Sequence, residues 1–238
     1  MFEINENARL RIRHVNDRRI IIIDDFYKNP DEIRNLALNS RERNAVKNNL
    51  PGTRLFVKTD EVKENLKSVF DKYCLSGMWS RHIDPYTYEM QWDDCGFMCN
   101  IMNDASILRD PWFSIPHQDA YPYSNDFLQF GVVIYLNKPE ECAGGTNFYS
   151  YKGKMSVPYN IFKYMDKPEG FDEEIKSQED VYPYIRRWLY GDREWKVEYE
   201  AKMRYNRCIF YEADILHSQN MEIGMFDSRD RINQIFFL

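Results

Sequence analysis

The amino-acid sequence predicts a mainly β protein with flanking α-helices, built as a single domain over residues 1–238. Short segments rich in β-branched and aromatic residues, separated by turn residues, fill most of the chain after about residue 86. One of them, FLQFGVVIYLN at 127–137, is almost entirely apolar, as a strand covered on both faces would be. Two amphipathic helical patterns precede these segments. Many short strands of this kind favour a β-sandwich or a jelly roll.

The N-terminal part, residues 1–85, is expected to form an α/β support for the β core. Four consecutive isoleucines at 20–23 indicate a buried strand, and Asn29 can cap the helix that follows it. A second helix is expected at 62–73, where apolar residues recur at helical spacing. Both helices would pack on a sheet through one apolar face. In the first helix that face comprises Ile33, Leu36 and Ala37.

The C-terminal part, residues 86–238, is expected to be the β core. The charged segment 152–194, which contains tyrosine and proline, interrupts the strand pattern and reads as an insertion between core strands. Such an insertion either walls a substrate site or is only a surface excursion. The predicted strands are YTYEMQW (86–92), FMCNIMN (97–103), FLQFGVVIYLN (127–137), TNFYSY (146–151), KVEYEAKM (196–203), RCIFYEA (207–213) and RINQIFFL (231–238).

Charge and cysteine content restrict the classes of partner and compartment. The formal net charge is −6 and the isoelectric point about 5.4, so the surface does not favour nucleic acid, although a local basic patch stays open. Five cysteines without framework spacing argue against a disulfide scaffold and favour a reducing, cytoplasmic location. No apolar run reaches the roughly 20 residues of a membrane span, so no membrane partner is expected.

Two His-x-Asp pairs are candidate halves of a metal site: His117 with Asp119, and His82 with Asp84. Either pair could present an imidazole and a carboxylate to one ion, or could consist of ordinary loop residues. A second histidine from a distant strand would complete a triad of two histidines and one carboxylate, which leaves three adjacent positions open on iron. His217, after the predicted strand RCIFYEA, is the candidate. The order of the surrounding strands favours His117 and Asp119 as the pair, and His82 as a loop residue.

The order of these features resembles the Fe(II)/2-oxoglutarate-dependent oxygenase superfamily, in its prolyl-4-hydroxylase-like branch of phage and bacterial type. The resemblance covers residues 86–238 and depends on HQD, YLN, GGTNF, CIFYEADILH and a late RIN, in that order. IIIIDDFYKNPDEIRNLAL near the N-terminus is also similar to the entry segment of such proteins. The resemblance implies a cupin-like double-stranded β-helix, or jelly roll. It further implies Fe(II) on His117, Asp119 and His217, with 2-oxoglutarate as cosubstrate.

The resemblance also implies an arginine that holds the far carboxylate of 2-oxoglutarate through a bidentate fork. Arg229 and Arg231 are two residues apart and would face the same side of one strand, so strand parity leaves both open. A polar residue two positions after the arginine is common in the family, and Asn233 favours Arg231. If His82 and Asp84 were the pair and His117 the second histidine, this arginine would be expected about 10–14 residues after His117. Residues 127–131, FLQFG, contain no arginine.

Two departures from the family pattern leave details open. Relatives often carry a supporting tyrosine on the strand before the His-x-Asp pair, where this chain has MCNIMND; Asn100, Tyr88 or Tyr135 could replace it. Relatives often have glycine before the strand that leads to the second histidine, where this chain has Asn206. Asparagine tolerates the left-handed backbone conformation, so we expect the turn to be retained.

The expected activity is hydroxylation of a C–H bond with release of succinate and CO2. The substrate would be a protein side chain, such as proline, or a small amino-acid-like molecule. The alternative function is a non-catalytic jelly-roll module that binds a ligand or a protein. It predicts that one member of the triad lies far from the others or is held in a buried hydrogen bond. Aromatic residues that could shape the substrate mouth, or only pack there, are Trp112, Tyr121 and Tyr123.

Overall fold

The structure is a computed structural model, and it describes most but not all of the chain. The described residues are 1–40, 44–45, 52–57, 97–109, 115–119, 130–157, 194–227 and 229–237, with the single positions 64, 68, 180, 183 and 184. Within these residues, no helix has the length and apolar character needed to cross a membrane.

Antiparallel strands are the predominant secondary structure of the described residues, confirming the mainly β prediction. The elements, in chain order, are β1 Arg9–Val15, β2 Arg18–Asp24, α1 Pro30–Asn39, β3 Asn44–Ala45, β4 Thr53–Val57, β5 Phe97–Met102, α4 Asp104–Arg109, β6 Phe130–Tyr135, the 3-10 helix η2 Pro139–Glu141, β7 Gly145–Tyr151, β8 Trp195–Lys202, β9 Arg207–Glu212, β10 His217–Asn220 and β11 Arg231–Phe237.

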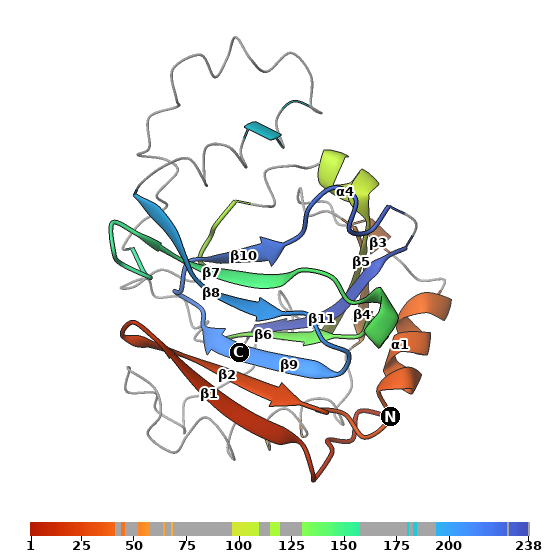
Figure 1. Ribbon diagram of the computed structural model, residues 1–238. Coiled ribbons are helices and arrows are strands. Elements are labelled where there is room, and N and C mark those ends of the chain that lie inside the picture. Colours follow the sequence, from red (N-terminus) through yellow and green to blue (C-terminus); the bar gives the residue numbers. More distant parts are fainter. Residues whose placement is uncertain are drawn as a thin grey trace.

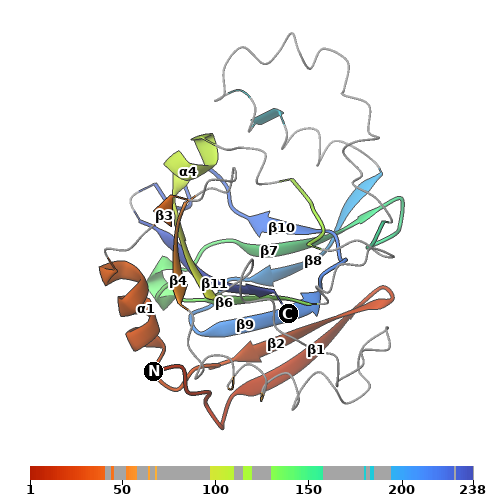
Figure 2. The ribbon, with the colours of Figure 1, turned by 180° about the vertical axis from the view of Figure 1, so that it is seen from behind.

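The described strands form two sheets that lie one over the other (Figure 1). The larger has eight strands in the order β1-β2-β9-β6-β11-β5-β4-β3, and the smaller has three in the order β10-β7-β8. The view from behind shows the same two layers, with α1 at the end of the larger sheet near β4 (Figure 2). The sheet order places strands from the two ends of the chain side by side, since β2 pairs with β9 and β5 with β11.

Apolar side chains cover both faces of the larger sheet. On one face, Ile21, Ile23 and Ile134 belong to a buried cluster that includes Ile33 and Ala37 of α1. On the other face, residues such as Ile20, Ile22, Val133 and Tyr211 pack with Phe148 and Ala201 of the smaller sheet. All six residues of β6 are buried. The prediction of a strand covered on both faces is therefore confirmed for β6.

The strand predictions agree with β2, β5, β6, β7, β8, β9 and β11 to within a few residues at their ends. The first helix is also confirmed, with Ile33 and Ala37 buried and Leu36 packed against the same cluster. Asn29 occupies the N-cap position, but its side chain makes no capping hydrogen bond, so that detail was wrong. The predicted strand 86–92, most of the predicted helix 62–73 and most of the insertion 152–194 lie outside the described residues.

Strands β3 and β4 were not predicted, and neither were β1 and β10. In β1, exposed Arg9, Arg11 and Arg13 alternate with half-buried Leu10 and Ile12, and β1 is the outermost strand of the larger sheet as described. Strand β10 is short and begins at His217 itself. Strands β1 and β10 escaped prediction because they contain few of the apolar residues on which the sequence prediction depended.

Asn206 forms the turn that leads into β9 in the left-handed conformation, with φ of 58°. Its side chain accepts a hydrogen bond from Tyr27 N at 2.8 Å and donates to Tyr27 O at 2.8 Å. Its backbone amide donates to Tyr135 O at 2.9 Å. The expectation that Asn206 adopts a left-handed turn is confirmed, and its side-chain amide additionally joins the turn to the N-terminal segment.

Substitution of Asn206 should separate the backbone effect from the side-chain effect. Asn206→Gly keeps the left-handed turn but loses two hydrogen bonds, so it should lower the free energy of unfolding by about 2 kcal/mol. Asn206→Ala also places an alanine in the left-handed backbone conformation, so it should lower the free energy of unfolding by about 3 kcal/mol. Urea denaturation monitored by circular dichroism measures both. An alanine variant as stable as the glycine variant would contradict this account.

Candidate metal centre

A reciprocal backbone bridge brings His117 and His217 together. The amide of His117 donates to the carbonyl of His217 at 2.8 Å, and the amide of His217 donates to the carbonyl of His117 at 2.9 Å. Residues paired in this way lie directly opposite each other with side chains on the same face. The two ring centroids are 4.5 Å apart. A third backbone bond, from Asp119 N to Ala213 O at 2.8 Å, holds the carboxylate residue against the segment before β10.

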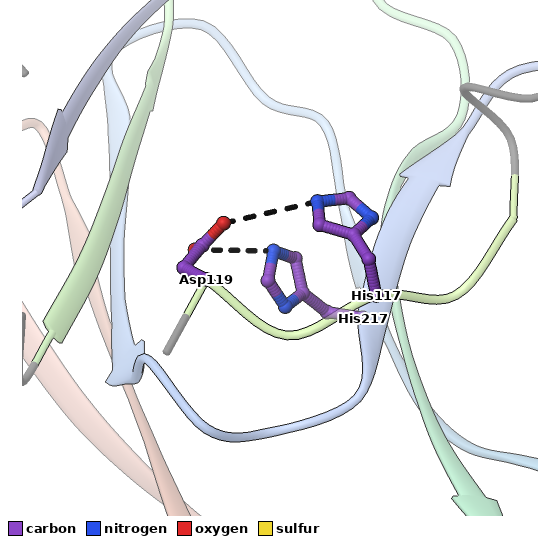
Figure 3. A group of neighbouring side chains, drawn as sticks. All are labelled: His117, Asp119 and His217. Atoms are coloured by element: carbon purple, nitrogen blue, oxygen red, sulfur yellow. Dashed lines mark ion pairs between the residues drawn. The ribbon is translucent and has the colours of Figure 1, made fainter. Parts of the chain in front are cut away.

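The side chains of His117, Asp119 and His217 converge on one point (Figure 3). His117 Nε2 lies 3.8 Å from Asp119 Oδ1, and His217 Nε2 lies 3.4 Å from Asp119 Oδ2. One ligand atom from each of the three residues lies within 4.8 Å of the others. Two ligands that each bind one ion at about 2.1 Å are separated by about 3–4 Å, so only a small contraction is needed to hold a metal.

Backbone carbonyls fix both imidazoles in the same tautomer. His117 Nδ1 contacts Ile115 O at 3.1 Å, and His217 Nδ1 contacts Ile215 O at 2.8 Å. A carbonyl only accepts hydrogen bonds, so each Nδ1 carries the hydrogen. In the neutral rings each Nε2 therefore offers its lone pair toward Asp119, as a metal ligand requires.

Burial differs among the three residues. The side chains of His217 and Asp119 are 6% and 9% exposed, whereas that of His117 is 46% exposed. Burial lowers the pKa of His217 to about 4, with the nearby His117 ring lowering it further and Asp119 opposing the shift. The His217 ring is therefore neutral at neutral pH. Within the described part of the chain, the site faces solvent on the His117 side.

An ion-pair network holds the turn between β9 and β10. Arg18 of β2 pairs with Glu212 and, at 3.3 Å, with Asp214. The hydroxyl of Ser156 also donates to Asp214 Oδ2 at 2.9 Å. These contacts hold residues 212–214, which bond Asp119 through Ala213 and lead directly into His217. The network thus supports two of the three candidate ligands from a neighbouring strand.

Arg231, at the start of β11, is a buried cation on the inner side of the larger sheet. It is 2% exposed, and it donates to Asn233 Oδ1 at 2.7 Å and to Gly145 O at 3.4 Å. No carboxylate within the described ranges forms an ion pair with it, and its Nε and Asn233 Nδ2 lack hydrogen-bond partners there. Burial lowers the pKa of Arg231. A buried guanidinium and amide with donors left over favour an anion as ligand.

Arg229 lies elsewhere, and the expectation that it shares a strand with Arg231 was wrong. It precedes β11, is exposed, and donates to Glu140 O at 3.1 Å. The side chain of Asn137 bonds the backbone on either side of Arg231. The Asn137 side chain donates to Asp230 O at 2.8 Å and accepts from Ile232 N at 2.7 Å. Arg231, and not Arg229, is therefore the arginine buried on the inner side, with its flanking backbone held by Asn137.

The other cosubstrate candidates lie in one register row. Asn233 of β11 is opposite Asn100 of β5 on one side and Tyr135 of β6 on the other. The Tyr135 ring lies 5.7 Å from the Arg231 guanidinium carbon, while its hydroxyl contacts Thr146 Oγ1 at 2.7 Å. Burial raises the pKa of Tyr135 to about 12, so it remains protonated. Tyr135 therefore contacts Arg231 through its ring and not through its hydroxyl.

The remaining predicted site residues lie outside the described residues. These positions are His82, Asp84, Tyr88, Trp112, Tyr121 and Tyr123.

One residue that contacts the site was not predicted from the sequence. It is Tyr211 of β9, whose hydroxyl lies 3.1 Å from His217 Nε2 and 3.4 Å from Asp119 Oδ2. Burial, with the charge of Asp119, raises its pKa well above the ordinary value. A glycine inside the neighbouring strand, Gly131, was the available signal, since it marks a close approach.

Residues 6–230 of the chain match the protein family described as "Family of unknown function (DUF6445)". No curated protein matches the chain.

The neutral state of His217 makes stability depend on pH. In protein stripped of metal by a chelator, the unfolded imidazole has a pKa of 6.5 and the folded one about 4. Between these values the unfolded state binds more protons, so stability falls as the pH falls. The gap corresponds to about 3 kcal/mol.

Denaturant titrations of the wild type and of His217→Gln from pH 7 to pH 4 measure this effect. The difference in unfolding free energy, wild type minus variant, should fall by about 3 kcal/mol over that range. A difference that stays constant would mean that the ring titrates normally in the fold.

Proposed function

The chain belongs to the DUF6445 family, and we propose that it is an Fe(II)- and 2-oxoglutarate-dependent dioxygenase. It would hydroxylate a C–H bond of a protein side chain or of a small amino-acid-like molecule and release succinate and CO2. The observation that carries the proposal is the convergence of His117, Asp119 and His217, with both Nε2 atoms turned toward the carboxylate. Two imidazoles and one carboxylate are the ligand set of non-haem Fe(II) oxygenases.

The donor set suits Fe(II). Imidazole nitrogen and carboxylate oxygen are ligands of intermediate and hard character, and no cysteine joins the described cluster. The carbonyls of Ile115 and Ile215 would keep the rings oriented when the ion binds, as is usual for metal-bound histidines. Three protein ligands leave the other coordination positions to cosubstrate and oxygen.

Arg231 and Asn233 would hold the far carboxylate of 2-oxoglutarate. Their unpartnered donors are buried, and the guanidinium presents a fork that fits a carboxylate. Gly145, whose carbonyl contacts Arg231, and Phe148, which lies opposite His217, are three residues apart on β7. That separation is about 10 Å along the strand, so one small dicarboxylate could reach from the triad to the guanidinium.

The proposed core is a double-stranded β-helix. Two facing antiparallel sheets with apolar side chains between them support this reading, and so does the position of the triad. His217 begins β10 of the smaller sheet, and Arg231 begins β11 of the larger sheet. An anion held between two sheets would be shielded from water on both sides, which strengthens its pairing with Arg231.

Bound iron and 2-oxoglutarate would supply the oxidation of the C–H bond, and the chain would supply geometry. Asp119 and the two imidazoles would hold the ion, and Arg231 would orient the cosubstrate. Phe148 lies beside the ring of His217, with the centroids 6.4 Å apart, and excludes water on that side. The exposed face of His117 would be the side from which a substrate approaches.

Formation of the ternary complex is the direct test of the proposal. Anaerobic addition of Fe(II) and 2-oxoglutarate should produce the weak visible charge-transfer band of the chelate. His217→Gln and Asp119→Asn should abolish the band because each removes one ligand of the ion. Absence of the band in folded wild-type protein, together with unchanged behaviour of both variants, would favour the non-catalytic module.

Arg231 and Arg229 form a matched pair for testing the cosubstrate pocket. Arg231→Gln should weaken 2-oxoglutarate binding at least about 30-fold, equivalent to about 2 kcal/mol, because it removes the buried charge. Arg229→Gln removes an exposed arginine two residues away and should bind like wild type. Titration of the charge-transfer band gives both affinities. Equal affinities in the two variants would place the anion pocket elsewhere.

A further inference from the structure

Tyr211 reaches into the candidate metal centre from β9 and is not among the residues of the proposed triad. The side chain is 2% exposed, and its ring centroid lies 4.5 Å from that of His217. Its hydroxyl is 3.1 Å from His217 Nε2 and 3.4 Å from Asp119 Oδ2. The hydroxyl therefore contacts two candidate ligands at the atoms they would present to an ion.

The surrounding structure fixes the position of the Tyr211 ring. Gly131 lies opposite Tyr211 on β6, and a Cβ there would come within 2.4–2.6 Å of the ring carbons and the hydroxyl. Glycine inside a strand weakens the strand, and here it provides the space that the ring occupies. On another side Phe148 packs against the ring in an edge-to-face contact at 5.2 Å. Tyr211 therefore has little freedom to move its hydroxyl away.

The hydrogen-bonding roles at this point follow from the neighbouring groups. His217 Nδ1 donates to Ile215 O, so Nε2 carries a lone pair and can only accept. An ionised Asp119 also only accepts. The Tyr211 hydroxyl, protonated at neutral pH, is the donor to both atoms, and it has one hydrogen to give. The shorter distance to Nε2 indicates that this atom receives it in the metal-free protein.

A metal ion and the Tyr211 hydroxyl compete for the same lone pair. When an ion binds His217 Nε2, the hydroxyl loses its acceptor there, and Asp119 Oδ2 is the acceptor already within reach. A hydrogen bond to an ionised carboxylate is stronger than one to a neutral ring nitrogen. Occupation of Oδ2 by this bond favours binding of the ion through Oδ1 alone, which keeps a further coordination position free.

We propose that Tyr211 is a positioning residue of the metal centre whose hydroxyl donates to His217 Nε2 in the metal-free protein and to Asp119 Oδ2 once an ion is bound. The proposal rests on the metal centre of the proposed function. Tyr211 keeps His217 oriented before the metal arrives and then restricts Asp119 to one oxygen. Gly131 contributes by leaving the space that the phenol ring needs.

Zn(II) alone is the probe, because it binds nitrogen and oxygen ligands without redox chemistry. Calorimetry gives its affinity for chelator-stripped protein, and near-ultraviolet difference spectroscopy reports the change of acceptor at the Tyr211 hydroxyl. Wild type should bind with a tyrosine difference band. Tyr211→Phe should lack the band and should bind Zn(II) about 10-fold more weakly than wild type. This is the low end of the effect of removing a residue that supports a metal ligand. The effect is small because the variant also loses the hydroxyl that competes with the ion for His217 Nε2.

Tyr149→Phe is the matched control. Tyr149 is also 2% exposed, and its hydroxyl contacts Ser218 Oγ at 3.0 Å and not the candidate ligands. It should keep both the band and the affinity. Gly131→Ala keeps the Tyr211 hydroxyl but displaces the ring, so it should weaken Zn(II) binding and reduce the band. Circular dichroism establishes that each variant is folded under the conditions of the titration.

The outcomes separate this proposal from the proposed function. Wild-type affinity in Tyr211→Phe, or a band that persists without Tyr211, would overturn the role of Tyr211 while the metal centre stands. Wild-type Zn(II) affinity and a wild-type band in folded Gly131→Ala would also overturn the role of Tyr211. If wild type and His217→Gln are equally unable to bind Zn(II), the metal centre itself is wrong, and the role of Tyr211 falls with it.

Discussion

Two main-chain hydrogen bonds between His117 and His217 carry the arrangement of the candidate centre. They belong to the backbone, so the imidazoles are brought side by side without any attraction between the rings. The bond from Asp119 to Ala213 adds a third point of attachment between the same two segments. A slip of one residue in this pairing would turn the side chains to opposite faces, so the register of these short segments decides whether three ligands exist at all.

The inner side of the larger sheet combines tight apolar packing with polar groups that are costly to bury. Arg231 and Asn233 are almost fully buried, and each has a side-chain donor without a partner among the described residues. Proteins tolerate such groups chiefly where a ligand completes them, because an uncompensated buried charge lowers stability by several kcal/mol. The surrounding core, with Ile20, Ile22 and Phe148, provides the stability that offsets this cost.

Much of the β architecture could be predicted from local sequence, because β6 and β2 carry continuous apolar runs that only a doubly covered strand accommodates. The spacing of His117, Asp119 and His217 also suggested the residues that the fold brings together. The start of β11 could not be predicted from local sequence, since the backbone there is bonded by Asn137, which is 93 and 95 residues from its two partners in that region. Tyr211 escaped prediction for a similar reason: in the sequence it is one more aromatic residue of a core strand.

Strand β1 is the outermost strand of the described larger sheet, and its composition has a consequence for the molecule in a crowded cell. A bare strand edge exposes amide and carbonyl groups that can recruit a strand from another chain. Arg9, Arg11 and Arg13 place three guanidinium groups along β1, and all three are exposed. Another strand docking on this edge would have to desolvate these groups, two of which are paired with Asp25 and Asp24, so β1 resists the intermolecular pairing from which aggregates grow.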